Sequence, residues 1–115
     1  MSTDKEIEQE IQAKGLAAPR VTPAHIEANI EGEYYANGAG AFSNNTLPNS
    51  HHNSLHLLTF CVLILKNGFI VTGESACASP ENFDAELGRK IARQNAVAKI
   101  WPLMGYELRS KLAAA

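Results

Sequence analysis

The sequence has few cysteines and no long hydrophobic run. Its 115 residues include only Cys61 and Cys77, too few for a disulfide framework or a zinc knuckle, so we expect two free thiols. The amino terminus is charged from the fourth residue onward and lacks the apolar core of a signal peptide. No apolar run approaches the roughly 20 residues that a bilayer requires. We therefore expect a cytoplasmic protein with no membrane partner.

Histidines are absent from the second half of the chain. All four precede residue 57, and His51, His52 and His56 fall in a polar segment with no cysteine or carboxylate at metal-ligand spacing. We expect these three histidines to be solvated rather than to bind a metal. Ser75 and the cysteines therefore lack a candidate base, and no P-loop or dinucleotide-binding glycine motif occurs. The sequence predicts no catalytic residue, no metal, no cofactor and no enzymatic activity.

Charge of either sign is modest. The net charge is -2, and 19% of the residues are charged. Residues 1–56 hold three Lys or Arg and seven Asp or Glu, whereas residues 57–115 hold seven and five. An anionic ligand should therefore bind the second half, but the lack of a basic tract argues against nucleic-acid binding. The length and the 45% hydrophobic content fit a single domain over residues 1–115.

A β-hairpin is the strongest local signal. Residues 57–65 are almost all apolar, too short for a membrane span, and typical of a strand buried on both faces. Asn67-Gly68 then favours a type I′ turn, and β-branched and aromatic residues resume at 69–72, at the start of a strand predicted over 69–75. The sequence predicts two antiparallel strands here.

A long helix is predicted to follow the hairpin. Ser79 can cap it with Pro80 at its first position, and an apolar stripe at helical spacing should pack on the sheet. We expect the helix to run from about 80 to 101, because a residue before proline, here Trp101, is pushed out of the helical region. Leu103, Tyr106, Leu108 and Leu112 predict a short terminal helix. The stripe comprises Phe83, Leu87, Ile91, Val97, Ala98 and Trp101.

The first half predicts short helices and a loop. Thr3 with Glu6 forms a capping-box pattern, and Thr22-Pro23 is a second helix start, so residues 1–33 should form short helices. Residues 36–54 are rich in Gly, Asn and Ser and predict an exposed loop, and residues 55–115 hold the hairpin and later helices. The fold class is therefore α+β: an antiparallel β-sheet with a central hairpin, packed by a long C-terminal helix and a short terminal helix, and preceded by short N-terminal helices.

The stretch from Leu57 to Tyr106 resembles a known family. It contains NGF at 67–69, TGESA at 72–76, ENFD at 81–84, GRKIA at 88–92 and KIWPL at 99–103. This conjunction resembles the small accessory proteins of tailed phages typified by the gene 49 product of phage N-four and the gene 66 product of phage Sf-six. It is also similar to the Thoeris anti-defence one proteins, phage-encoded oligomeric sponges for cyclic ADP-ribose signals of bacterial immunity, some of which also bind cyclic oligonucleotides.

The resemblance implies sequestration of a cyclic nucleotide immune signal without cleavage. A cyclic ADP-ribose isomer carries an adenine, two riboses and a pyrophosphate, so its site needs an aromatic surface, amide or carboxylate groups, and cations. In the family resemblance Asn82 and Asp84 are the polar ligand contacts, and Phe69 is the stacking residue. The candidate cations are Arg89, Arg93 and Lys99.

Other interpretations of the same residues stay open. Asn82 and Asp84 could simply cap the helix, Phe69 could belong to the core, and Arg89 with Arg93 could form a solvated basic face. The alternative function is a protein- or nucleic-acid-interaction module of phage early genes. An enzyme that degrades the signal is a third possibility.

The apolar strand also predicts self-association. Residues 57–65 are too apolar for one face to meet water, and Gly88 offers a close-approach point on the long helix. We expect a homo-oligomer, at least a dimer, with ligand sites near the subunit boundaries.

Overall fold

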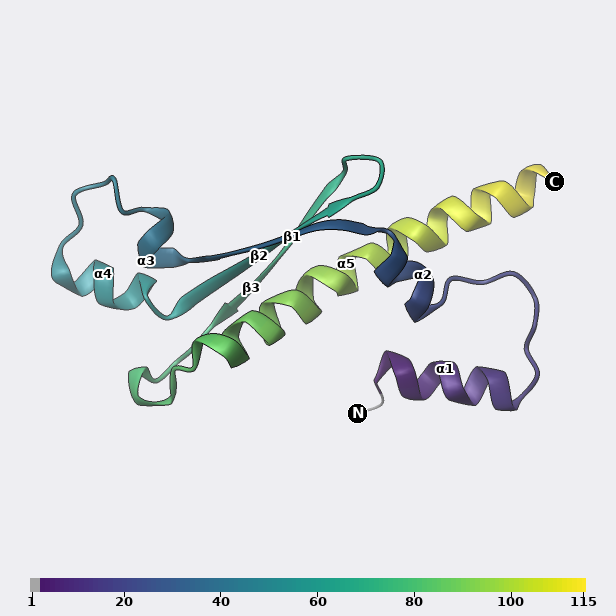
Figure 1. The fold of residues 1–115 in the computed structure, drawn as a ribbon, viewed down its shortest axis with the longest axis horizontal. Coiled ribbons are helices and arrows are strands. Elements are labelled where there is room, and N and C mark those ends of the chain that lie inside the picture. Colours follow the sequence, from purple (N-terminus) through teal and green to yellow (C-terminus); the bar gives the residue numbers. More distant parts are fainter. Residues whose placement is uncertain (1–2) are drawn as a thin grey trace.

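The protein is a three-stranded antiparallel sheet with one long helix packed on it (Figure 1). The computed structural model describes residues 3–115. The sheet has the order β1-β2-β3, which confirms the predicted α+β class. The helices are α1 (Asp4–Ala13), α2 (Pro23–Ala28), α3 (Gly38–Ala41), α4 (Asn49–Leu55) and α5 (Ala85–Ala114), with a 3-10 helix η1 (Pro80–Asn82). The strands are β1 (Ile30–Asn37), β2 (Leu58–Leu65) and β3 (Ile70–Ala76).

The predicted hairpin is confirmed, but its turn is of a different type. Gly68 has φ of 87°, and no other residue between 66 and 69 has a positive φ, whereas a type I′ turn needs two such residues. The Gly68 N–H donates to the Leu65 carbonyl at 2.8 Å, and the Leu65 N–H donates to the Phe69 carbonyl at 2.9 Å. This pattern is a three-residue loop that ends in a left-handed glycine. The Asn67 side chain instead accepts a hydrogen bond from the Phe69 N–H at 2.9 Å.

The first half contains more regular structure than predicted. The capping box at Thr3 and the Thr22 cap with Pro23 are confirmed at α1 and α2. Residues 30–33, however, belong to β1 rather than to a helix, and the predicted loop over 36–54 contains α3 and α4. Asn37 stabilises this arm because its side chain accepts from the Ala39 N–H and donates to the His56 carbonyl at 2.7 Å. The loop prediction was wrong because it counted turn-forming residues and ignored such caps.

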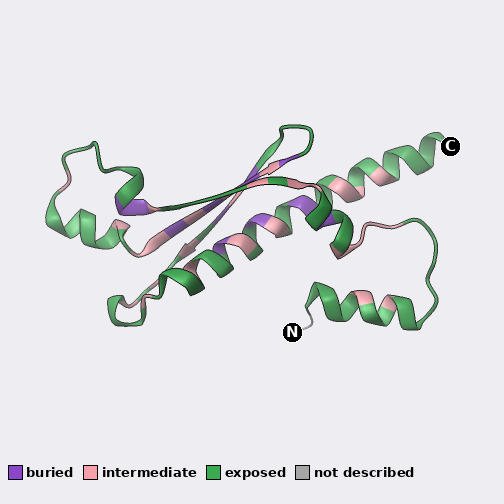
Figure 2. Cartoon of the chain, in the orientation of Figure 1, coloured by how far each residue is buried: buried purple, intermediate pink, exposed green. Residues whose placement is uncertain are grey.

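The helix α5 packs on the sheet through Ala92, Ala96 and Ile100 and not through most of the predicted stripe. Leu87 and Ile91 are 53% and 39% exposed, so the stripe prediction was wrong at these positions, although Val97 and Trp101 do pack against the core. Gly73 explains the difference, since a Cβ there would lie 2.2 Å from the Ala92 carbonyl oxygen. Only small side chains fit at so close an approach. Figure 2 shows the resulting buried face of α5 against the strands. The core consists of Ile26, Cys61, Leu63, Leu65, Val71, Ala92, Ala96 and Ile100.

Gly88 also allows α5 to lie close to the sheet of its own chain. A Cβ at Gly88 would lie 2.9 Å from the Thr59 hydroxyl oxygen. The expectation that Gly88 offers a close approach to another subunit was therefore wrong, because its own sheet fills the space.

Pro102 does not end the long helix. The helix α5 continues through Pro102 to Ala114, so the separate terminal helix predicted after it does not exist. A proline inside a helix costs about 3 kcal/mol, but Pro102 and Ala98, whose carbonyl loses its partner, are both exposed to solvent. Trp101 and Met104 pack against the core on either side of the proline. We attribute the continuity of α5 to this packing.

We predict that Gly73→Ala destabilises the protein. The new methyl group would overlap the backbone of α5 at Ala92 and Ala96, and overpacking of this kind costs about 1 to 3 kcal/mol or more in free energy of unfolding. Urea denaturation monitored by circular dichroism measures the change.

Gly105→Ala is the matched control for Gly73→Ala. No atom lies within 4 Å of a Cβ built there, and alanine is favoured over glycine inside a helix by about 1 kcal/mol. The control should therefore raise the urea midpoint. An unchanged midpoint for Gly73→Ala would contradict the close contact between α5 and β3.

Candidate functional site

The six residues predicted to bind ligand lie in three separate places on or near α5. Asn82, Asp84 and Arg89 are at its amino-terminal end. Arg93 lies one turn further, and Phe69 and Lys99 meet in a separate groove at the hairpin end of the sheet. About fifteen residues of continuous helix separate Asp84 from Lys99, or about 22 Å. One chain therefore does not unite all six residues in one site.

The junction between β3 and α5 is built by local capping. The Asp84 Oδ1 accepts a hydrogen bond from the Leu87 N–H at 3.0 Å and so caps α5. The expected cap at Ser79 was wrong: its hydroxyl donates to Glu81 at 2.8 Å, and the chain forms η1 before the helix begins at Ala85. Asp84 therefore caps α5 with one carboxylate oxygen and keeps a second oxygen that the cap does not use. Within residues 3–115 neither that oxygen nor the Asn82 side chain has a hydrogen-bond partner.

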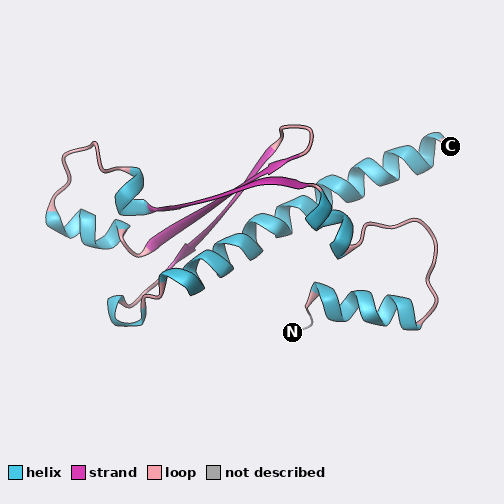
Figure 3. Cartoon of the chain, in the orientation of Figure 1, coloured by secondary structure: helices cyan, strands magenta, loops and turns pink. Residues whose placement is uncertain are grey.

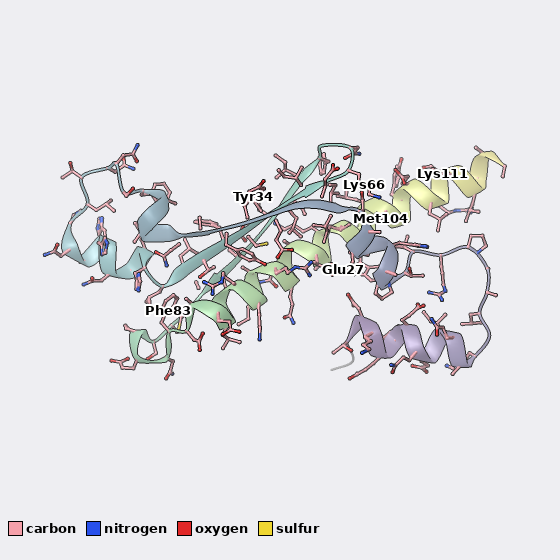
Figure 4. The ribbon with its side chains drawn as sticks, viewed as in Figure 1. Glu27, Tyr34, Lys66, Phe83, Met104 and Lys111 are labelled. Atoms are coloured by element: carbon pink, nitrogen blue, oxygen red, sulfur yellow. The ribbon has the colours of Figure 1, made fainter. Side chains whose placement is uncertain are left out.

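A groove lies beside this junction, and we call it the α4 groove. Its volume is about 400 Å³. The Phe83 ring packs against the His56 ring with centroids 5.0 Å apart and planes tilted by 52°. Figure 4 shows Phe83 at the start of α5. The walls of the α4 groove are His52, Asn53, His56, Leu57, Pro80 and Phe83.

Sequence reasoning missed the α4 groove. Phe83 was assigned to the apolar stripe of the helix, and His52 and His56 were assigned to a solvated loop. Nothing local in the sequence pairs His56 with Phe83, because the arm formed by α3 and α4 brings them together. The only signal was the ENFD motif itself, which places Phe83 between Asn82 and Asp84.

Arg93 is engaged within the fold. Its two terminal nitrogens donate to the Glu27 carboxylate at 3.0 and 2.7 Å, and its Nε donates to Glu33 at 2.9 Å. These hydrogen bonds join α5 to α2 and β1, and Figure 4 shows Glu27 beside α5. The guanidinium lowers the pKa of Glu33, with a smaller contribution from the Tyr35 hydroxyl. The two glutamates in turn raise the pKa of Arg93. Its charge is balanced by the protein and not available to a phosphate in this conformation.

The second groove, which we call the hairpin groove, has a volume of about 440 Å³. Phe69 is 54% exposed, so the alternative that it belongs to the core is wrong. Tyr106 is 78% exposed and was not predicted as a site residue. Lys99 supplies the positive charge, and with the two rings it gives this groove both an aromatic surface and a cation. The walls are Phe69, Ile70, Val71, Thr72, Lys99, Pro102, Leu103 and Tyr106.

Both cysteines are free thiols, as predicted. Cys61 is fully buried in the core, and burial raises its pKa. The Cys77 thiol donates to the Ser79 carbonyl at 3.1 Å. Over residues 3–115 no group of three or more His, Cys, Asp and Glu side chains is arranged to hold a metal ion.

The family assignment follows from residues 21–112. They match the model of the phage protein family described as N4 Gp49/phage Sf6 gene 66. The chain belongs to this family. The match extends from α2 through β1 and the sheet to nearly the end of α5, well beyond the stretch that carried the resemblance. No curated protein matches the chain, and no solved structure does. None of the helices described for this phage protein has the length and apolar character needed to span a bilayer.

We predict that Arg93→Gln lowers the stability of this phage protein. Loss of the paired guanidinium should cost about 0.5 to 1.5 kcal/mol at pH 7, a value reduced for the partial solvent exposure of the group. Because the folded pKa of Glu33 is lowered, its stabilisation is present above the ordinary glutamate range. It is lost as the pH falls below about 4. Urea unfolding at neutral and acid pH measures both effects.

Arg89→Gln is the matched control, since Arg89 is exposed and its side chain has no ion pair in residues 3–115. It should leave the urea midpoint unchanged. A difference between Arg93→Gln and wild type that does not shrink at acid pH would rule out the ion pairs as its cause.

Proposed function

We propose that this phage protein binds and sequesters a cyclic nucleotide immune signal in the host cytoplasm without cleaving it. The ligand class is a cyclic ADP-ribose isomer, or a cyclic oligonucleotide that shares the base, ribose and phosphate groups. The proposal rests on the similarity of the ENFD stretch to the anti-defence sponges. The observation that favours it is the position of Asn82 and Asp84 next to the aromatic wall of the α4 groove.

The α4 groove, together with residues beside it at the start of α5, supplies the groups that such a ligand needs. Phe83 and His56 present the aromatic surface on which an adenine can stack. The Asn82 amide can both donate and accept, as the edge of a base requires. The second oxygen of Asp84 can accept hydrogen bonds from ribose hydroxyls. Arg89, just over one helical turn beyond Asp84, is the cation nearest in sequence for the pyrophosphate.

Phe69 and Lys99 belong to the hairpin groove, the second candidate place for the same ligand. A ring closed through one adenine, two riboses and a pyrophosphate is much shorter than the distance between the two ends of α5. One molecule therefore contacts either the α4 groove or the hairpin groove of a given chain. We favour the α4 groove because the ENFD motif borders it and places an amide and a carboxylate next to its aromatic wall.

A protein that sequesters a nucleotide releases it unchanged, whereas an enzyme that degrades it releases a product. Cleavage of a pyrophosphate or glycosidic bond needs an activated nucleophile or a positioned acid and base. Cys61 is buried, and the Cys77 thiol is engaged with a backbone carbonyl. Burial of Cys61 and the hydrogen bond of Cys77 disfavour either thiol as a nucleophile, which supports binding without cleavage.

Heating the loaded protein tests this distinction. Protein incubated with a cyclic ADP-ribose isomer, separated from free ligand and then heat-denatured should release the intact ligand, identified by mass spectrometry. Release of a linear product would show an enzyme, and release of no nucleotide would show an interaction module. Either outcome would overturn the proposal.

We predict that Asn82→Ala weakens ligand binding without changing stability. Loss of a hydrogen bond between neutral groups typically costs about 0.5 to 1.5 kcal/mol, roughly two- to tenfold in affinity. Asn82 makes no side-chain hydrogen bond within residues 3–115, so the melting temperature of the free protein should not move. Isothermal titration calorimetry and thermal melts measure the two quantities.

Asp84 needs two variants because it also caps α5. Asp84→Ala should lower stability by about 0.5 to 2 kcal/mol through loss of the cap and also weaken binding. Asp84→Asn keeps a good cap but removes the charge, so it should weaken binding alone. Phe69→Ala is the control in the hairpin groove. A loss of affinity in Phe69→Ala but not in Asn82→Ala would move the site to the hairpin groove.

A further inference from the structure

Two histidines line the α4 groove from one side. His52 and His56 lie four residues apart, and the His56 N–H donates to the His52 carbonyl at 3.0 Å, so a complete helical turn joins them. Side chains at this spacing lie on the same face of a helix, and both belong to the groove wall. Figure 3 shows the helices of this arm at the end of the sheet where α5 begins. His51, also on α4, is not part of the wall.

Contacts with two other elements hold His56 in place. The side-chain amide of Asn37, at the end of β1, donates to the His56 carbonyl at 2.7 Å. The His56 ring packs against the Phe83 ring with centroids 5.0 Å apart. A cation within about 6 Å of an aromatic centroid is attracted to the face of the ring, so Phe83 accommodates a positive charge on His56. The imidazole is therefore positioned before a ligand arrives.

The wall of the α4 groove has no permanent positive charge. Of its residues only the two histidines can carry one, since neither lysine nor arginine is among them. Glu81 and Asp84 each directly follow a wall residue and place carboxylates beside the groove. The Ser79 hydroxyl donates to Glu81 and lowers the pKa of its carboxyl group, so Glu81 is ionised at neutral and mildly acidic pH. A phosphate inside the groove therefore needs the histidines to offset these negative charges.

We propose that His52 and His56 bind the phosphates of the ligand in their protonated form, so that the α4 groove holds an anion more tightly as the pH falls. The inference rests on the proposed function and names the phosphate-binding residues of that same site. Histidine is the side chain whose charge ordinarily changes between about pH 5 and 8. Both ring nitrogens of the protonated form donate hydrogen bonds, which suits phosphate oxygens. The added affinity is present in full below the histidine range and is lost as the pH rises through it.

The other charged groups of the neighbouring elements do not produce this pH dependence. Glu81 belongs to η1, and Asp84 and Arg89 belong to the start of α5. Glu86, further along α5, pairs with Lys90. Carboxylate, guanidinium and ammonium groups ordinarily keep their charges between about pH 5.5 and 7.5. A change in affinity within this range therefore reports on histidine.

Isothermal titration calorimetry with a cyclic ADP-ribose isomer at about pH 7.5 and about pH 5.5 tests the inference. Both phosphates of this ligand keep their negative charge over the range, so the change reports on the protein. The affinity should rise about fivefold or more at the lower pH, a value that allows for the solvent exposure of the histidines. Binding should also take up protons, so the measured enthalpy should depend on the ionisation enthalpy of the buffer.

Three variants assign the effect to the groove. His52→Lys keeps a positive charge at both pH values, and because His52 is exposed on α4 this variant should fold. It should bind more tightly than the wild type at neutral pH and show a flatter pH profile. The double variant His52→Gln with His56→Gln should lose the pH dependence. His51→Gln is the matched control on the same helix and should keep the profile of the wild type.

Proton NMR of the histidine rings gives a test that does not need the nucleotide. Sulfate keeps its double negative charge over the same pH range and serves as the anion. At equal ionic strength, replacing chloride by sulfate should raise the titration midpoints of His52 and His56. His25 on α2 and His51 lie outside the groove wall and should not respond. Single His→Gln variants assign the four signals.

Three results would overturn the inference. The first is an affinity for the cyclic ADP-ribose isomer that does not change with pH. The second is a pH dependence that persists in the double variant, and the third is a sulfate response that does not distinguish His52 and His56 from the other two histidines. A wild type that binds no cyclic ADP-ribose isomer at either pH rejects the proposed function instead. A sulfate response confined to His52 and His56 then still supports the anion site.

Discussion

The contact between the backbones of α5 and β3 determines how the rest of the chain is placed. At Gly73 a Cβ would come within 2.2 Å of the Ala92 carbonyl oxygen and 2.3 Å of the Ala96 nitrogen. At this point the helix rests on the strand with only alanine-sized side chains between them. Larger apolar residues of α5, such as Leu87 and Ile91, are turned outward. The same contact sets the amino-terminal end of α5 beside the end of β3, where the chain forms the α4 groove.

Because α5 lies so close to β3, the core between helix and sheet holds few large side chains. The largest fully buried side chains are Ile26, Leu63, Ile100 and Cys61, which is a small set for a chain of this length. Hydrophobic stabilisation scales with the apolar area removed from water, and the face of the sheet opposite α5 leaves Phe60, Val62 and Ile64 of β2 in partial contact with solvent. The Arg93 hydrogen bonds to Glu27 and Glu33 add polar links between layers.

Local signals in the sequence predicted the features that depend on a few neighbouring residues. The capping box at Thr3, the Thr22 cap and the two strands of the hairpin each follow from spacings of two to four residues. Features that depend on distant contacts were missed. Pro102 stays inside α5 because Trp101 and Met104 are held by the core, and the buried face of α5 follows from Gly73, which lies on another element. The α3 and α4 helices depend on caps from Asn37 and on contacts with each other.

In the candidate site, too, contacts with distant elements decide what the sequence could not predict, here for two arginines one helical turn apart. Arg89 and Arg93 lie four residues apart on one side of a predicted helix, and the sequence gives no reason to separate them. In the fold, β1 and α2 bring Glu33 and Glu27 to Arg93, while Arg89 is left exposed. The nearest candidate cation for a phosphate is therefore the arginine closer to Asp84. Because α5 is one continuous helix, Lys99 stays about 22 Å from that carboxylate. A ligand held by Asn82 and Asp84 must take its positive charge from their own end of the helix.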